Sequence, residues 1–299
     1  MKDFPLVTVV TGYYNRKENL KESVQSVLNQ DYPNFEYIIF DDCSTDGTYE
    51  MLREFSDPRL RVLRHEQNIG FTKGIIAAIA YSKGELIAIH GAGDLSFSAR
   101  LRKQVEFLDT HPDIGIVGCL LEDVSSEGTV IHSPLGDNSK HHFTQGEVMY
   151  RKSLYFHAGG YNSFFKYGQF TILKHELLKL TKAGFVEEVL YRRIHFQNGV
   201  TRNPRRLVEQ RCYIALGKEI AEGKGFLYHD SSEVIARVCI SNIEHVIGTP
   251  QEELLLFHLR RRSYSLTVLF RICKSGLLSV KFFKKMAFRY LSLLDRVRF

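Results

Sequence analysis

The chain has 299 residues, 44% of them hydrophobic and 25% charged, a composition that excludes an intrinsically disordered protein. Its net charge of +6 is uneven, because residues 255–299 hold eleven basic residues and one acid, a local charge of +10 that leaves the remainder at −4. Five cysteines, odd in number and never spaced as C-x-x-C, argue against a disulfide framework and a structural zinc site. They are Cys43, Cys119, Cys212, Cys239 and Cys273.

The first 120 residues alternate apolar runs with helical patterns. The apolar runs predict strands at residues 6–11, 35–41, 60–65, 85–90 and 115–121. Between them, apolar residues at i, i+3 and i+4 spacing predict helices at 17–30, 45–55, 72–84 and 98–111. Strands that alternate with helices indicate βαβ units, and therefore an α/β fold with a mostly parallel, Rossmann-like sheet flanked by helices.

The pattern changes after residue 121. Short strands are expected within 128–133, 146–152, 159–168 and 184–196, with one helix at 172–184. From Pro204 the pattern is helical nearly to the end. We therefore predict a domain at 1–203, with halves 1–121 and 122–203, and a helical, basic C-terminal extension at 204–299.

Polar residues and glycines follow the predicted strands. After the first four strands the chain reads "GYYN" (12–15), "DDCSTDGT" (41–48), "EQNIG" (66–70) and "GAGD" (91–94). Any one of these loops could be an ordinary turn, since turns and helix N-caps use the same residues. Ligands bind outside the carboxyl ends of parallel strands, so loops gathered at that edge favour a binding site.

The sequence resembles the family 2 glycosyltransferases, inverting enzymes of the GT-A fold, from about residue 5 to about residue 205. The resemblance lies in residues 7–48, 68–89, 99–118 and 159–169. It implies transfer of a sugar from a nucleotide-diphosphate sugar to a glycan or lipid-linked acceptor, in polysaccharide biosynthesis of the cell envelope. It also makes 1–121 the nucleotide-binding half and 122–203 the acceptor half.

Carried over by position, the resemblance assigns four nucleotide-binding residues. Gly12 and Tyr14 would line the pocket for base and ribose, where an aromatic ring can stack on the base. Asp42 would accept a hydrogen bond from an N–H group of the base. Lys73 would lie near the diphosphate, with a solvated helix residue as the alternative.

The loop at residues 91–94 departs from the family. There the family usually reads Asp-x-Asp-Asp, whose carboxylates hold Mg²⁺ or Mn²⁺ across the two phosphates. This chain has Gly91, Ala92, Gly93 and Asp94, so only Asp94 remains as a metal ligand. Mg²⁺ can bind through one or two carboxylates with phosphates and water. The alternative is a metal-free site of glycine amides and Lys73, since backbone N–H groups can bind anions.

A second departure concerns the general base, which removes the proton of the acceptor hydroxyl. The family usually places an acid where this chain has Phe170, and Ile172 replaces the next one. Glu147, Asp123 and His157 are the substitutes in the acceptor half, each with an ordinary structural role as its alternative. A catalytically inactive relative that binds a nucleotide or acts as a scaffold is therefore the alternative function.

The C-terminal segment predicts an amphipathic helix. Its basic face would carry Lys281, Lys284, Lys285, Arg289 and Arg296, and its apolar face Phe282, Met286, Tyr290, Leu293 and Val297. Such a helix is attracted to an anionic membrane surface, although the alternative is a helix packed on the domain.

The expected location is cytoplasmic, with peripheral contact at the inner face of the membrane. No run reaches the ~18–20 apolar residues needed to cross a bilayer, and the N-terminus enters a strand too early for a signal peptide. No nucleic-acid recognition module is apparent, so nucleic acid is not an expected partner.

Overall fold

The computed structural model describes residues 4–125, 130–132, 144–163 and 165–196. The chain divides into two units, residues 1–197 and 198–299, and all the described residues belong to the first. The predicted C-terminal extension, including its amphipathic helix, lies outside the described residues. Within the described ranges no helix is long and apolar enough to cross a membrane.

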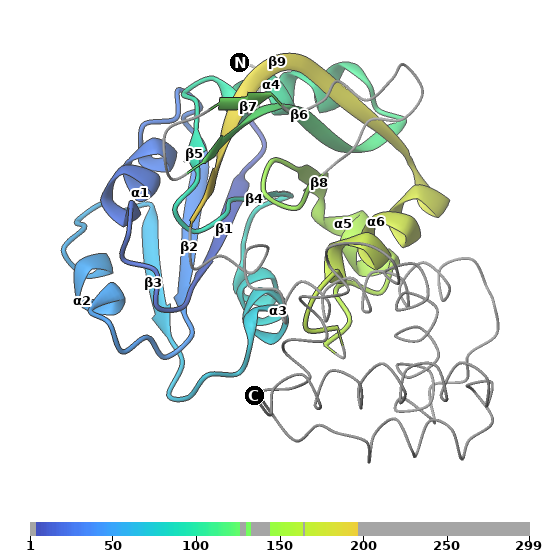
Figure 1. The fold of residues 1–299 in the computed structure, drawn as a ribbon. Coiled ribbons are helices and arrows are strands. Elements are labelled where there is room, and N and C mark those ends of the chain that lie inside the picture. Colours follow the sequence, from blue (N-terminus) through green and yellow to red (C-terminus); the bar gives the residue numbers. More distant parts are fainter. Residues whose placement is uncertain (1–3, 126–129, 133–143, 164, 197–299) are drawn as a thin grey trace, which may run out of the picture. The chain divides into compact units, whose positions relative to one another are not determined.

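Nine strands of the described chain form one mixed sheet (Figure 1). The strands are β1 (Val7–Tyr13), β2 (Phe35–Asp41), β3 (Leu60–Arg64), β4 (Leu86–Ile89), β5 (Leu95–Ser96), β6 (Ile114–Ser125), β7 (Val130–His132), β8 (Met149–Arg151) and β9 (Lys182–His195). Their order is β3-β2-β1-β4-β8-β6-β9-β5, with β7 paired to β6. Strands β1 to β4 are mutually parallel, as are β6 and β9, whereas β5, β7 and β8 pair antiparallel. The α/β class and the early strands are thus confirmed.

Helices cover both faces of the sheet and bury it in two apolar clusters. The helices are α1 (Leu20–Leu28), α2 (Thr48–Leu52), α3 (Phe71–Tyr81), α4 (Arg100–Thr110), α5 (Lys152–His157) and α6 (Gln169–Leu180). Helices α1, α2 and α4 pack on one face, and α3, α5 and α6 on the other (Figure 1). Because successive side chains of a strand point to opposite faces, Ile39 joins the first cluster and Ile38 the second. Burial on both sides explains why these strands are continuously apolar.

Two predicted elements in the second half were wrong in extent. The helix expected at 172–184 runs from Gln169 to Leu180, because Thr181 adopts an extended backbone and Lys182 already belongs to β9. The strand expected within 184–196 begins earlier, because β9 has 14 residues and pairs with β6 from Lys182 to His195, with irregularities in its register. Within residues 159–163 and 165–168 no strand forms, although one was expected there.

Candidate functional site

The carboxyl ends of the parallel strands deliver the polar loops to one edge of the sheet. In the ladder Tyr13 lies opposite Asp41, and Asp41 opposite Arg64. Residue Ile89 at the end of β4 lies opposite Val10 of β1. The loops that follow β1, β2, β3 and β4 therefore start side by side, as the sequence predicts for a binding edge.

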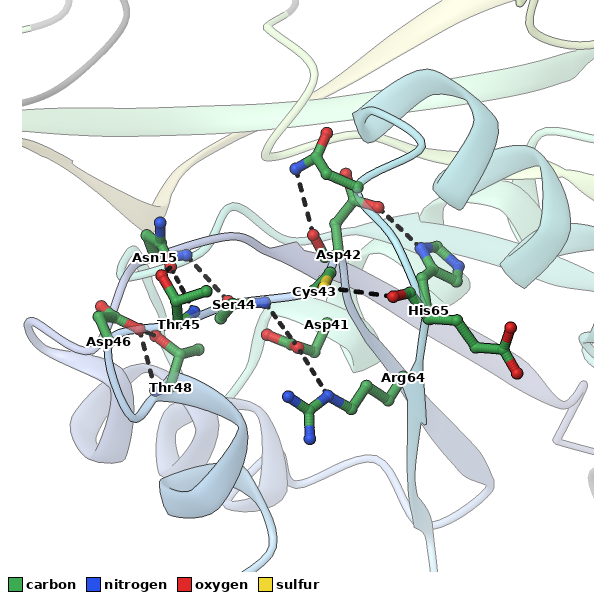
Figure 2. A network of polar contacts seen from close by, with 12 residues as sticks. Asn15, Asp41, Asp42, Cys43, Ser44, Thr45, Asp46, Thr48, Arg64 and His65 are labelled. Carbon is green, nitrogen blue, oxygen red and sulfur yellow. Dashed lines mark hydrogen bonds and ion pairs between the residues drawn. The ribbon is translucent and has the colours of Figure 1, made fainter.

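Hydrogen bonds join the loop after β1 to the loop after β2 (Figure 2). The backbone N–H of Asn15 donates to Ser44 Oγ at 2.9 Å, and the backbone N–H of Thr45 donates to Asn15 Oδ1 at 2.8 Å. The Arg16 N–H donates to Thr48 Oγ1 at 3.0 Å, while Thr48 Oγ1 donates to Asp46 Oδ1 at 2.6 Å. The two loops therefore form a single hydrogen-bonded unit.

Asp42 ties the end of β2 to the loop before α3. Its Oδ1 lies 2.9 Å from His65 Nδ1 (Figure 2). The same oxygen accepts the Ile69 N–H at 2.9 Å, and Oδ2 accepts the Gly70 N–H at 2.8 Å. The residue is 3% exposed. Asp42 is thus a structural anchor of this edge as well as the predicted partner of a base.

The other predicted nucleotide-binding residues lie around this unit. Tyr14 is 51% exposed, so its ring is accessible for stacking. Gly12 makes room for a core side chain, because a Cβ there would lie 2.2 Å from the Phe40 ring. Gly74 of α3 does the same from the other side, at 2.3 Å. Lys73 is exposed on the first turn of α3 and forms no ion pair with any of the described residues.

Asp94 is 8% exposed and folds back over its own loop. Its Oδ2 accepts the Tyr191 hydroxyl at 2.7 Å, and its Oδ1 accepts the Ile194 N–H at 2.9 Å. Burial raises the pKa of Asp94 in spite of these hydrogen bonds. A Cβ at Gly91 would lie 2.1 Å from Asp94 Oδ2, so the carboxylate occupies the space that a side chain at position 91 would need.

The second glycine of the loop is covered by an aromatic ring. Gly93 has a φ of +90°, and a Cβ there would lie 2.7 Å from the Phe196 ring. The guanidinium carbon of Arg16 stacks over the same ring, 4.3 Å from its centroid. The Phe196 ring therefore stands where the side chain of the family's acid would begin.

The glycine amides of this loop already have acceptors within the protein. The Gly91 N–H donates to the Tyr191 hydroxyl at 2.8 Å, and the Gly93 N–H donates to Ser23 Oγ at 3.2 Å. The anion nest of glycine amides, one of the two alternatives drawn from the sequence, is therefore not formed by these two groups.

Strand β9 supplies residues of the candidate site that the sequence prediction missed. Tyr191, Arg193 and His195 alternate along it and so share one face. Arg193 donates to Asp123 through Nε at 2.5 Å and Nη2 at 2.7 Å, and His195 Nε2 lies 2.9 Å from Asp123 Oδ1. Burial tends to raise the pKa of Asp123, but these partners outweigh it and hold the pKa below its ordinary value. The recurrence of a polar group at every second residue, 191, 193 and 195, was the available signal.

The candidates for a general base lie in three different environments. Asp123 is paired with Arg193 and His195. His157 is exposed at the end of α5, with its Nδ1 2.8 Å from the Ser153 carbonyl oxygen. Glu147 is 0% exposed, and burial raises its pKa to about 7. Phe170, at the position of the family's base, is 7% exposed and packs in the apolar cluster under α6.

The residues around Asp94 do not supply the ligand set of a divalent cation. Mg²⁺ and Mn²⁺ favour several oxygen ligands, and this loop offers a single carboxylate, which Tyr191 and Ile194 hold in place by hydrogen bonds. No three His, Cys, Asp or Glu side chains gather to hold a metal ion in the part of the chain that the structure describes. The cations next to Asp94 are instead side chains, namely Arg16, Arg193 and His195.

Solved structures with the same architecture define the class of the fold. TarS of S. aureus, residues 1–349 with UDP-GlcNAc, superposes with a TM-score of 0.61 at 16% identity, covering 87% of this chain and 76% of that one. The mannosyltransferase PcManGT of Pyrobaculum calidifontis, solved with GDP-Man and Mn²⁺, gives 0.59 at 18%, covering 92% and 80%. The fold is therefore that of the GT-A glycosyltransferases.

The sequence comparisons then give the family. The family described as Glycosyl transferase family 2 matches residues 8–181, more than half of the chain. EpsE of Bacillus subtilis, which is named as a glycosyltransferase, is 32% identical over 173 residues, 54% of this chain and 62% of EpsE. The Escherichia coli protein WfaP, named as a UDP-Glc:α-D-GlcNAc-diphosphoundecaprenol β-1,3-glucosyltransferase, is 30% identical over 106 residues, 36% of this chain and 42% of WfaP.

This chain belongs to glycosyltransferase family 2. It spans less than two thirds of the length of these two relatives.

Proposed function

We propose that the protein transfers a sugar from a nucleoside-diphosphate sugar to a glycan or lipid-linked acceptor, with inversion at the anomeric carbon. The family match over residues 8–181 carries this proposal. The convergence of the loops after β1, β2 and β4 at one edge of the sheet supports it. A lipid-linked acceptor agrees with the substrate in the name of WfaP.

In this proposal the edge of the sheet binds the donor. The exposed ring of Tyr14 stacks on the base, and Asp42 accepts a base N–H through a lone pair that its protein partners leave free. Asp94 and the cations near it face the diphosphate, where negative charge grows as the sugar leaves.

Titration calorimetry with UDP, GDP and dTDP tests the donor site. At least one of them should bind, and Asp42→Asn should weaken that binding about 10-fold, since a hydrogen bond to a charged group contributes ~1.5–3 kcal/mol. Asp31→Asn, which changes an exposed carboxylate remote from these loops, is the matched control. Unaltered binding by Asp42→Asn would reject this assignment of the pocket.

A catalytically inactive, nucleotide-binding relative is the second candidate, and the burial of Phe170 at the base position favours it. Hydrolysis of nucleotide sugars separates the two, because it needs the donor half of the site but no particular acceptor. Turnover of any nucleotide sugar would reject the inactive protein. Tight nucleotide binding without hydrolysis or transfer would support it.

We also propose peripheral contact with an anionic membrane surface through the basic segment at 276–299, which lies outside the described residues. Its charge carries this proposal, at ~1 kcal/mol for each basic residue near such a surface. Co-sedimentation with vesicles containing phosphatidylglycerol should succeed and should fall with added salt. Equal binding to neutral vesicles would contradict the proposal.

A further inference from the structure

Arg16 is a cation beside the loop at residues 91–94, called the glycine loop from here on. No carboxylate of that loop forms an ion pair with it. Its guanidinium is half-buried, and burial lowers its pKa, which is the effect of partial desolvation. It forms no ion pair with any carboxylate of the described residues. Its neighbour across the loop, Asp94, directs both oxygens to Tyr191 and Ile194 instead.

The position of Arg16 is fixed from two sides. Its backbone N–H donates to Thr48 Oγ1 at the start of α2, and its guanidinium carbon lies 4.3 Å from the centroid of the Phe196 ring, just past β9. That ring in turn packs on Gly93. A guanidinium held by an aromatic ring, with its N–H groups unused by carboxylates, is prepared to bind an anion through charge-assisted hydrogen bonds.

The other cations beside the loop are already matched. Arg193 makes two hydrogen bonds to Asp123, and His195 contacts the same carboxylate. Arg100, next to the same loop, is fully buried and donates to Ser96 Oγ and the Ile89 carbonyl oxygen. Asp94 is the one carboxylate of the loop, and among the described cations around it Arg16 is partly exposed and forms no ion pair. The guanidinium of Arg16 is therefore available to an anionic group from outside the protein, such as a diphosphate.

We propose that Arg16 binds the diphosphate of the donor in place of a divalent cation, so that the donor site works without metal. The inference rests on the proposed function, because it assumes a nucleoside-diphosphate donor. When the bond between the anomeric carbon and the diphosphate oxygen breaks, its electron pair stays on the diphosphate. The guanidinium stabilises that charge by hydrogen bonding and takes up no proton, since Arg stays charged throughout.

Titration calorimetry on the full chain tests this, with UDP, GDP and dTDP and with the matching nucleosides, in EDTA and in Mn²⁺. The expected result is diphosphate binding in EDTA that Mn²⁺ does not strengthen. Arg16→Gln should weaken diphosphate binding about 10- to 100-fold and leave nucleoside binding unchanged, because only the phosphates contact the guanidinium. Lys17→Gln, which removes the exposed neighbouring cation, is the matched control and should change neither.

The possible results separate this inference from the proposed function. Diphosphate binding that appears only with Mn²⁺ overturns the inference and leaves the proposed function standing. The same holds if Arg16→Gln binds the diphosphate as tightly as the wild type does. Binding of no nucleotide under either condition overturns both. Unchanged nucleoside binding by Arg16→Gln shows that the variant is folded.

Discussion

Glu147 is a carboxylic acid without exposed surface, and its environment decides its charge. Thr144 donates to it from the backbone N–H and from the hydroxyl, yet burial dominates and raises its pKa from an ordinary 4.5 to about 7. Below pH 4.5 the side chain is protonated in both the folded and the unfolded chain. Between 4.5 and about 7 the unfolded chain releases the proton while the folded chain keeps it.

The free energy of unfolding should therefore fall by roughly 3 kcal/mol across that range and then level off, as a shift of this size implies. Urea unfolding of the wild type and of Glu147→Gln, at about pH 5 and about pH 8, measures the effect. The variant should gain stability relative to the wild type as the pH rises. A difference independent of pH would show that Glu147 is ionised in the folded protein.

Gly91 is required by the carboxylate of Asp94. Because an added Cβ would lie 2.1 Å from Asp94 Oδ2, Gly91→Ala should force the carboxylate away from Tyr191 and cost about 1–3 kcal/mol of stability. A double-mutant cycle with Asp94→Ala identifies the cause, because the penalty should shrink when the carboxylate is absent. Additive effects of the two substitutions would mean that the clash lies elsewhere.

At the scale of an element, α6 shows why an absent base cannot simply be restored. Phe170 lies in its first turn and packs in the second apolar cluster. Phe170→Asp should therefore lower stability by about 3–5 kcal/mol and restore no transfer, since it removes a buried ring and buries a charge. Leu178→Asp, on the same helix but 44% exposed, should cost far less. Glycosyl transfer gained by Phe170→Asp would contradict this account.

Strand β9 marks the limit of prediction from sequence. The early strands were predictable because burial on both faces leaves continuous apolar runs, as in "FEYIIFD" at 35–41. In β9 charged residues interrupt the apolar ones without a regular period, and its place next to β6 and β5 depends on pairings between residues that are distant in sequence. The predicted site accordingly contained Asp94 but not Tyr191, the side chain that holds it. Likewise, helix α1 starts later than expected, because Asn19 adopts a left-handed backbone and uses its amide to hold the Gly93 carbonyl.

At the scale of the whole molecule, the boundary predicted at 203/204 can be tested. As far as the structure describes them, both apolar clusters are built from residues of the first unit. We therefore expect a fragment of residues 1–203 to unfold cooperatively and to bind nucleoside diphosphates as the full chain does. Circular dichroism during heating, together with calorimetric titration, measures both properties. A fragment that aggregates or lacks a cooperative transition would place part of the core after residue 203.

The glycine loop also bears on how this branch of the family could evolve. An aspartate at position 91 would collide with Asp94, and one at position 93 would meet the Phe196 ring on a backbone that disfavours any side chain. Each first step back toward the acid-rich loop is therefore harmful by itself, and Phe196 or Asp94 would have to change beforehand. Asp94 and Phe196 thus make a return to the acid-rich loop by single substitutions unfavourable. Such a return needs coordinated substitutions in the loop and at Phe196, just past β9, rather than a single codon change.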